Sequence, residues 1–276
     1  MAKAIRLMVL FGDTHCGSTW GMCPTGVTSV EGNEFRPNKL QAWLNEQWAD
    51  AHGEWVPSIV GKDPYAVCHT GDAMEGVHHG TKEIISPDEE DHLELAAALL
   101  KPVADRADAT YLVEGTECHT KNKESSLGKQ IGAVRYPYVT QRKNSWPRLD
   151  IEIAGARVIV QHHITTSIRN WTQATGLNTA LSQEQLRAVA NKEAPPRVLV
   201  SAHRHQFGIF ESMSGVSLVT HAWQGLTRHG RKVVPSDMDR PNPGIVILDW
   251  RNRDDGAPPE VHVRSYRSTE RKVIRL

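Results

Sequence analysis

The chain has 276 residues, of which 39% are hydrophobic and 23% charged, a composition typical of globular proteins. Its 32 basic residues balance its 32 acidic ones, so no bulk electrostatic field would attract it to nucleic acid or to an anionic membrane. No apolar stretch is long enough to cross a bilayer, and the first residues lack the cleavage site of a signal peptide. We therefore expect no membrane partner.

The cysteines predict a reducing compartment. Cys16, Cys23, Cys68 and Cys118 show neither C-x-x-C spacing nor the pattern of a disulfide framework. Because disulfides persist mainly in oxidising compartments, free thiols of this kind are typical of cytoplasmic proteins. We expect a cytoplasmic protein.

Strands and helices are predicted to alternate along most of the chain. Five short apolar runs each end in a cluster of Asp, Glu, His or Gly, and their near-continuous apolar character is typical of strands covered on both faces. Helical patterns lie between them, and two alternating strands close the series. In chain order, the predicted elements are strand 5–11, helix 38–52, strand 65–70, helix 86–107, strands 109–114 and 156–160, helix 178–194, and strands 196–202, 244–250 and 260–267.

The clearest helix signals lie at the start of 86–107. Ser86 is expected to cap this helix, with Pro87 at the first helical position and Glu89 completing a capping box. Pro102 should kink or end it. Because helices alternate with strands and no repeat or linker interrupts them, we predict a single α/β domain over residues 1–276.

The five buried strands are all followed by residues that can bind metals. The loops read GDTH, GDAME, GTECH, QHHI and SAHRH, and functional groups of open α/β sheets collect at such strand ends. Imidazoles mixed with carboxylates suit Mn, Fe, Zn, Co or Ni. The set is too large for one ion, whereas two ions about 3.5–4 Å apart that share a carboxylate would use it well. Its members are Asp13, His15, Asp72, Glu117, His119, His162, His163, His203 and His205.

The order of these blocks resembles the calcineurin-like metallophosphoesterases. D-x-H, G-D, a block like G-N-H, a strand-end His and a block like G-H-x-H follow one another between residues 11 and 205. The resemblance implies a four-layer sandwich, in which two mixed β-sheets are flanked by helices. The segment HAWQGLTRHG (221–230) also looks like phosphoesterases carried by bacteriophages, which would place the protein in a host cytoplasm.

The resemblance also implies a role for each block. Asp72 resembles the carboxylate that bridges two ions, and His119 resembles the histidine that contacts the scissile phosphate and assists the leaving group. The other residues resemble ligands of a first ion (Asp13, His15 and His205) and of a second ion (His162 and His203).

The sequence departs from the family pattern at three blocks. The block GTECH is one residue longer than G-N-H and lacks the asparagine, and Glu117 is expected to replace that ligand because Thr116 is a poor one. The usual H-G reads His162-His163, so either imidazole is available, and the first is favoured. In the last block Ala202 stands where glycine is usual, which is a mild change.

We therefore predict a phosphoric ester hydrolase with two divalent ions, manganese being favoured over Fe, Zn, Ni and Co. A hydroxide held between the ions is expected to attack phosphorus while His119 gives a proton to the leaving oxygen. Glu117 would make the centre formally neutral and so favour phosphodiesters over monoesters. The alternative is a nuclease that acts on DNA or RNA ends, and a less favoured one is an inactive scaffold with the same fold.

A basic segment follows His119, and its cations are candidates for substrate binding. Lys121, Lys123 and Arg135 are predicted to rim the site and attract phosphate esters, with a plain solvated face as an equal alternative. His78 and His79, which follow Asp72, are further candidates for substrate contact, again beside a solvated-loop alternative.

Overall fold

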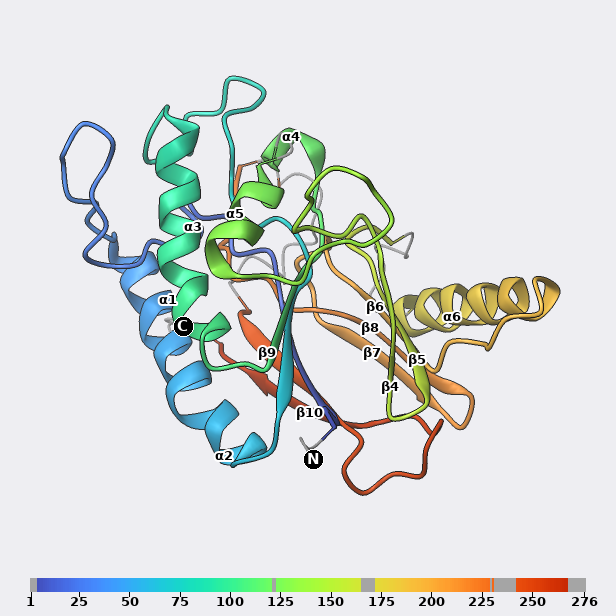
Figure 1. Cartoon of the computed structure of the whole chain (residues 1–276). Coiled ribbons are helices and arrows are strands. Elements are labelled where there is room, and N and C mark those ends of the chain that lie inside the picture. The colour runs from blue at the N-terminus through green and yellow to red at the C-terminus, as the bar shows by residue number, and fades with distance from the viewer. Residues whose placement is uncertain (1–3, 121–122, 165–171, 229, 231–241, 268–276) are drawn as a thin grey trace, which may run out of the picture.

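The computed structural model describes residues 4–120, 123–164, 172–228, 230 and 242–267. Two five-stranded sheets pack face to face, and helices cover the outer face of each (Figure 1). The protein is thus a four-layer α/β sandwich, which confirms the predicted fold class.

The first sheet has the strand order β10-β9-β1-β2-β3. Its parallel part consists of β1 (Leu7–Phe11), β2 (Tyr65–His69) and β3 (Ala109–Leu112). Strand β9 (Gly244–Asp249) pairs antiparallel with β1 and with β10 (Glu260–Ser265), as the alternating pattern of the last strands predicts.

The second sheet has the order β4-β5-β6-β8-β7. Strands β5 (Ala156–Val160), β6 (Val198–Ser201) and β8 (Gly215–Val219) run parallel, and β4 (Leu149–Ile153) and β7 (Gly208–Ser212) add antiparallel edges. Strands β4, β7 and β8 were not expected from the sequence, because short strands joined by tight turns carry little periodic signal.

The helices divide between the two outer faces. Helix α1 (Lys39–Asp50), the π-helical turn η1 (Ala51–Trp55), α2 (Val56–Val60), α3 (Glu89–Ala104) and α5 (Glu124–Ile131) lie against the first sheet, and α6 (Gln173–Ala190) covers the second. A single short turn, α4 (Glu117–Thr120), stands over the strand ends (Figure 1). Among the residues that the structure describes, no helix combines the length and apolar character needed to cross a membrane.

Two of the predicted helices begin elsewhere than expected. Asp88, not Ser86, caps α3, since its side chain accepts a hydrogen bond from the backbone N–H of Glu90, whereas Ser86 hydrogen-bonds to the Asp91 carboxylate. Helix α3 also continues past Pro102 to Ala104. Helix α6 starts and ends earlier than the predicted range of 178–194.

Strand β1 shows why the layers form. All of its side chains are buried, and successive ones point to opposite faces of the sheet. Leu7, Val9 and Phe11 pack against the helices, whereas Met8 and Leu10 pack between the sheets. A strand buried on both faces must be apolar throughout, which explains the continuous apolar run in the sequence.

Candidate metal centre

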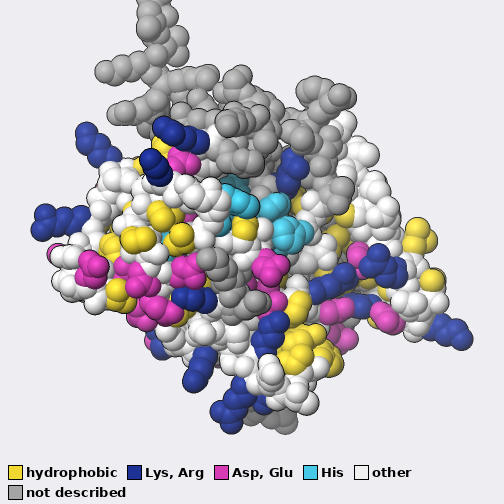
Figure 2. All heavy atoms as spheres, turned by 90° about the horizontal axis from the view of Figure 1, so that it is seen from above, with side chains coloured by type: hydrophobic (Ala, Val, Ile, Leu, Met, Phe, Trp, Pro, Cys, Tyr) yellow, Lys and Arg dark blue, Asp and Glu magenta, His cyan; other side chains and the backbone are white. Residues whose placement is uncertain are grey.

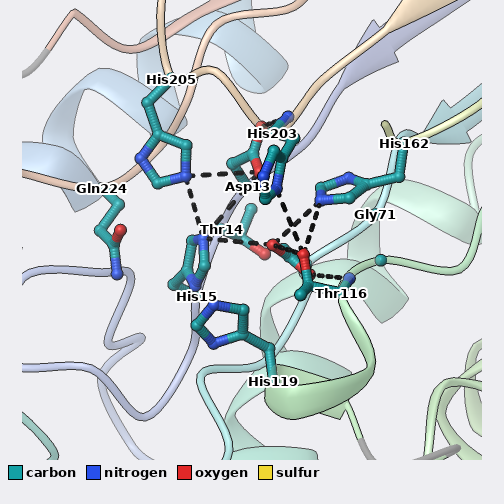
Figure 3. A network of polar contacts seen from close by, with 12 residues as sticks. Asp13, Thr14, His15, Gly71, Thr116, His119, His162, His203, His205 and Gln224 are labelled. Carbon is teal, nitrogen blue, oxygen red and sulfur yellow. Dashed lines mark hydrogen bonds and ion pairs between the residues drawn. The ribbon is translucent and has the colours of Figure 1, made fainter. Parts of the chain in front are cut away.

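The polar cluster lies where the carboxyl ends of parallel strands from both sheets meet (Figure 3). Hydrogen bonds join the two sets of strand ends. Nδ1 of His162 donates to the carbonyl of Thr70 at 3.0 Å, and the backbone N–H of Trp223 donates to the carbonyl of Asp13 at 3.0 Å. Site residues from the two sheets therefore hold one another in place.

The predicted ligands of the first ion lie together. One donor atom each of Asp13, His15 and His205 lies within 4.8 Å of the other two. The Nε2 atoms of the two histidines are 3.2 Å apart, and Oδ1 of Asp13 is 3.9 Å from Nε2 of His15 and 3.5 Å from Nε2 of His205. Because Asp13 and His15 lie on one tight turn after β1, both side chains reach the same point.

Asp72 lies between the two predicted halves of the site. Its Oδ2 atom is 3.9 Å from Nε2 of His15 and 3.0 Å from Nε2 of His162. Its side chain is almost completely buried. One carboxylate thus contacts histidines from both halves, which is the position that a bridging ligand needs.

Thr116, rather than Glu117, reaches the second half of the site. The Thr116 hydroxyl lies 3.2 Å from Oδ2 of Asp72, 3.3 Å from Nε2 of His162 and 3.2 Å from Nδ1 of His203. Glu117 begins α4, its side chain is exposed, and the structure describes no hydrogen bond or ion pair from its carboxylate to the cluster. The sequence-based preference for Glu117 over Thr116 therefore has no support in the geometry.

His162 and His163 occupy different environments. His162 is buried and contacts Asp72, whereas His163 is exposed, with its ring 4.5 Å from that of His203. Donor atoms of His162, His163 and His203 nevertheless lie within 4.8 Å of one another, so both neighbours remain candidates. Because Nδ1 donates to the Thr70 carbonyl, Nε2 of His162, which faces Asp72, is the nitrogen that can bind an ion, and this favours His162.

Backbone strain is concentrated at the cluster. Eight non-glycine residues in the described part of the chain have positive φ, and five of them are predicted ligands. Such conformations cost free energy, on the order of 1 kcal/mol or more each, and persist at sites where the surroundings enforce them. The five are Asp13 (49°), His15 (42°), Asp72 (52°), His203 (69°) and His205 (54°).

Two glycines allow the close approach of these loops. A Cβ atom on Gly71, whose φ is +110°, would lie 2.4 Å from Nδ1 of His162. A Cβ atom on Gly115 would lie 2.1 Å from Oδ1 of Asp72. No side chain fits at either position without displacing a predicted ligand.

Glu75 orients His15 from behind. Its Oε2 atom lies 2.9 Å from Nδ1 of His15 and accepts a hydrogen bond from Nε2 of Gln224 at 3.0 Å. A carboxylate in this position fixes the ring and raises the basicity of the opposite nitrogen. Gln224 was not predicted as a site residue, because it comes from a segment 149 residues away from Glu75 in the sequence.

His119 enters from α4. Its Nδ1 lies 2.8 Å from the carbonyl of Glu75, so Nδ1 carries the proton and Nε2 stays free to exchange one. Its ring meets the His15 ring edge-on at 4.8 Å. Burial, reinforced by the positive charge of His15, lowers the pKa of His119.

The charges of the site are strongly coupled. Burial alone would raise the pKa of Asp72, but the hydrogen bond from His162 and the charges of His162 and His15 hold it well below its usual range. Burial would lower the pKa of His162, yet Asp72 and Asp13 raise it to about 9. The cluster thus keeps its carboxylates ionised and attracts positive charge.

The residues predicted to bind substrate lie at several different places. Lys121 lies outside the described residues. Nζ of Lys123 pairs with carboxylates of α3, at 2.6 Å from Glu90 and 3.7 Å from Glu89. Arg135 is exposed and lines a separate hollow beside α5. His78 lies next to His119, with 4.4 Å between their ring centres, and the His79 ring lies 5.3 Å from that of His78.

The donors fit divalent metal ions. Oδ1 of Asp13 is buried and makes no hydrogen bond within the described structure, although its partner Oδ2 accepts one from the backbone N–H of His203. A buried carboxylate oxygen left without a donor but surrounded by imidazole nitrogens matches the ligand set of a borderline transition metal.

Comparison with known proteins agrees with this geometry. A family model described as calcineurin-like phosphoesterase matches residues 7–222. A search of curated proteins finds no match.

Solved structures of low sequence identity also match the chain. They include Vacuolar Protein Sorting 29 from Cryptosporidium parvum, with 13% identity and a TM-score of 0.43 over 96% of this chain and 100% of that one. An archaeal phosphodiesterase has 10% identity and a TM-score of 0.45, over 94% and 99%. A predicted phosphoesterase from Streptococcus pneumoniae has 12% identity and a TM-score of 0.36, over 97% and 100%.

The family match includes all five blocks that supply the cluster, from Asp13 to His205. Those blocks meet at one point between two mixed sheets. The chain belongs to the calcineurin-like phosphoesterase family.

Proposed function

We propose that this phosphoesterase binds two divalent ions and hydrolyses phosphodiesters. The observation that carries the two-ion proposal is the position of Asp72, whose Oδ2 atom lies between His15 of one ligand group and His162 of the other. A set of imidazoles and carboxylates without thiolates suits Mn, Fe, Zn, Ni or Co, and manganese is the ion we favour among them.

The ligands of the proposed centre follow from the contacts. Asp13, His15 and His205 would hold the first ion, and Asp72 would be shared between the two. His162 and His203 would hold the second, and the Thr116 hydroxyl would take the place that the sequence suggested for Glu117. Divalent ions held by these residues would supply charge to neutralise phosphoryl oxygens and would lower the pKa of a water molecule that serves as the nucleophile.

His119 supplies the proton that the leaving group needs. The Glu75 carbonyl holds Nδ1–H, so the ring acts as an acid only when Nε2 also carries a hydrogen, and this second proton is the transferable one; the attacking water, which loses a proton as it bonds to phosphorus, restores the balance. When the bond between phosphorus and the leaving oxygen breaks, this proton passes from Nε2 to that oxygen. No covalent bond between enzyme and substrate forms in this sequence.

The diester preference does not depend on Glu117. Because the Glu117 carboxylate is exposed, only Asp13 and Asp72 would offset the charge of the two ions, and the centre would not be formally neutral. Support comes instead from a hollow of about 1010 Å³ that includes His203 and His163 and runs along α6. A hollow beside the cluster has room for the second organic group of a diester.

A substrate panel tests the proposal. Metal-free protein should bind two equivalents of Mn²⁺ at this centre and then hydrolyse bis-p-nitrophenyl phosphate with a higher kcat/KM than p-nitrophenyl phosphate. His119→Ala should keep both ions and lower kcat by about 10²–10⁴-fold, with the larger loss for poorer leaving groups. Full activity in that variant would exclude His119 as the acid, and a monoester preference would exclude the diester assignment.

One observation favours a nuclease as the second candidate. Lys129, Arg135 and Arg142 line the hollow at α5 together with Ser125, Ser126 and Asn144, and no described acidic side chain pairs with the three cations. Their charge suits the phosphates of a polynucleotide, even though the whole chain is neutral.

Salt dependence separates the two candidates. If polynucleotides are substrates, Arg135→Glu combined with Arg142→Glu should raise KM for an oligonucleotide and flatten its dependence on salt, while leaving KM for bis-p-nitrophenyl phosphate unchanged. Lys62→Glu, an exposed change between α2 and β2, is the matched control. Equal KM values for the oligonucleotide in the wild type, the double variant and the control would leave only small phosphodiesters as substrates. Less than one bound equivalent of metal, with no hydrolysis on adding metal, would favour the inactive scaffold.

A further inference from the structure

Three metal-binding side chains lie beside the proposed centre without belonging to it. Donor atoms of His78, His79 and Cys118 lie within 4.8 Å of one another. The two histidines come from the loop after Asp72, and the cysteine comes from α4. Figure 2 shows histidine side chains gathered in a hollow on this face of the molecule.

Glu75 prepares His78 as a ligand. Oε1 of Glu75 lies 3.1 Å from Nε2 of His78, so Nε2 carries the proton and Nδ1 keeps a free electron pair. Nδ1 is buried and has no hydrogen-bond partner in the described structure. A histidine whose one nitrogen donates to a carboxylate and whose other nitrogen is free matches the usual arrangement of a metal-binding imidazole.

The loop is bent tightly onto α4. Gly76 packs so closely that a Cβ atom there would lie 2.1 Å from the carbonyl oxygen of His119. His79 has a φ of 48°, an unfavourable conformation for a residue with a side chain, and Gly76 and Gly80 also have positive φ. This bend brings both histidines next to Cys118, and an interaction of the His79 side chain would offset its strain.

We infer that His78, His79 and Cys118 form a third metal site, specific for zinc or a similarly thiophilic ion. Two imidazoles and one thiolate are typical zinc ligands, whereas the proposed dinuclear centre contains no thiolate. Ligand atoms of a tetrahedral zinc ion lie roughly 3.3–3.8 Å apart, so side-chain adjustments of about 1 Å close the site. The fourth position is left to solvent, because His79 is exposed.

The site has a consequence for His119. The ring centres of His78 and His119 are 4.4 Å apart, and Cys118 directly precedes His119 in the chain. An ion bound by all three ligands would fasten the loop to α4 and so limit the movement of the histidine that the proposed mechanism uses.

Cobalt reports thiolate binding directly. Metal-free, reduced protein is titrated with Co²⁺, and absorption is followed in the near ultraviolet, where thiolate-to-cobalt charge transfer appears. The wild type should show this band, saturating with one of three bound equivalents. Cys118→Ser should lose the band and retain two equivalents. Cys23→Ser, which changes a buried thiol outside the cluster, should behave as the wild type.

A second variant keeps the inference testable if Cys118→Ser fails to fold. His79→Ala should weaken the thiolate-linked equivalent at least about tenfold, whereas Lys82→Ala, in the same loop, should not. Absence of the band in the wild type, its persistence in Cys118→Ser, or unchanged affinity in His79→Ala would each overturn the third site. None of these readouts depends on phosphoesterase activity.

Discussion

Glu75 contacts several residues at the site through both its side chain and its backbone. Its carboxylate contacts His15, His78 and Gln224, and its carbonyl accepts from His119. Burial would raise the pKa of Glu75, but the hydrogen bonds from His15 and His78 lower it to about 2. Glu75 therefore stays ionised and orients several histidines at once.

Replacement of this carboxylate tests its orienting role. Glu75→Gln keeps the shape but removes the charge that fixes His15, so affinity for the first ion should fall by about 10–100-fold. Isothermal titration with Mn²⁺ measures the change.

Glu117→Gln is the matched control, because Glu117 is exposed. This variant should keep the affinity for each of the two ions and the ratio of diester to monoester activity. A loss of the second ion in Glu117→Gln would restore Glu117 as a ligand, and unchanged metal affinity in Glu75→Gln would remove the orienting role.

At the scale of elements, the start of α1 is tied to a site loop. Asn38 caps the helix by accepting from the backbone N–H groups of Leu40 and Gln41, and its amide donates to the carbonyl of Thr19 at 2.8 Å. The Gln41 side chain completes the capping box and donates to the carbonyl of Ser18. One cap therefore stabilises both the helix and the loop that follows His15.

Removal of the cap should lower stability. Asn38→Ala should reduce the free energy of unfolding by about 1–2 kcal/mol in urea denaturation, because backbone donors at the helix start lose their acceptor. Asn191→Ala, at the exposed C-cap of α6, where no side-chain hydrogen bond of Asn191 is described, should cost less than half of that. Equal losses would show that the capping contacts do not contribute.

Helix α5 carries a buried carboxyl group that makes stability depend on pH. Burial raises the pKa of Glu124 to about 8, from 4.5 in an exposed chain, despite the hydrogen bond that it accepts from Gly115. Between these values the folded protein keeps a proton that the unfolded chain releases. The free energy of unfolding therefore falls as the pH rises from 4.5 to about 8.

Glu124→Gln removes this dependence. In metal-free protein, the variant should gain stability relative to the wild type as the pH rises from 5 to 8, by on the order of 2 kcal/mol. Urea denaturation at several pH values measures the difference. Glu46→Gln, at an exposed position, should show a constant difference. If the Glu124→Gln difference is also constant, Glu124 is ionised in the folded protein.

At the scale of the molecule, the proposed centre joins the two sheets. Asp13 and Asp72 follow strands of the first sheet, and His162, His203 and His205 follow strands of the second. Ions bound between them connect loops that are otherwise held by a few hydrogen bonds. That the whole chain is one domain, that it is cytoplasmic, and that it resembles phage proteins remain predictions.

Metal removal should therefore weaken the whole fold. With free metal at about 100–1000 times Kd, a single bound ion adds about 2.7–4.1 kcal/mol to the free energy of unfolding. Chelation should lower the Tm and increase hydrogen exchange in loops 12–16 and 202–206, and Mn²⁺ should reverse both changes. If Tm and exchange are the same with chelator and with Mn²⁺, the ions do not connect the sheets.

The sequence alone determined the parts of the site that depend on local patterns. Apolar runs fixed the positions of β1, β2, β3, β5 and β6, because a strand covered on both faces must be apolar. The turns that follow these strands carry Asp13, Asp72 and His203, and parallel strands bring such turns to one edge. The types of donor residue and their order along the chain could be read from the sequence, and this order carries the resemblance to the family.

Only the tertiary structure decided which neighbouring side chain reaches the centre. Glu117 and Thr116 are adjacent, but α4 begins at Glu117 and leaves its carboxylate in solvent, while Thr116 lies against Asp72. Lys123 was predicted to rim the site, but its Nζ atom pairs with Glu90 of α3. Each of these outcomes depends on a contact between segments far apart in sequence, and local patterns contain no information about such contacts.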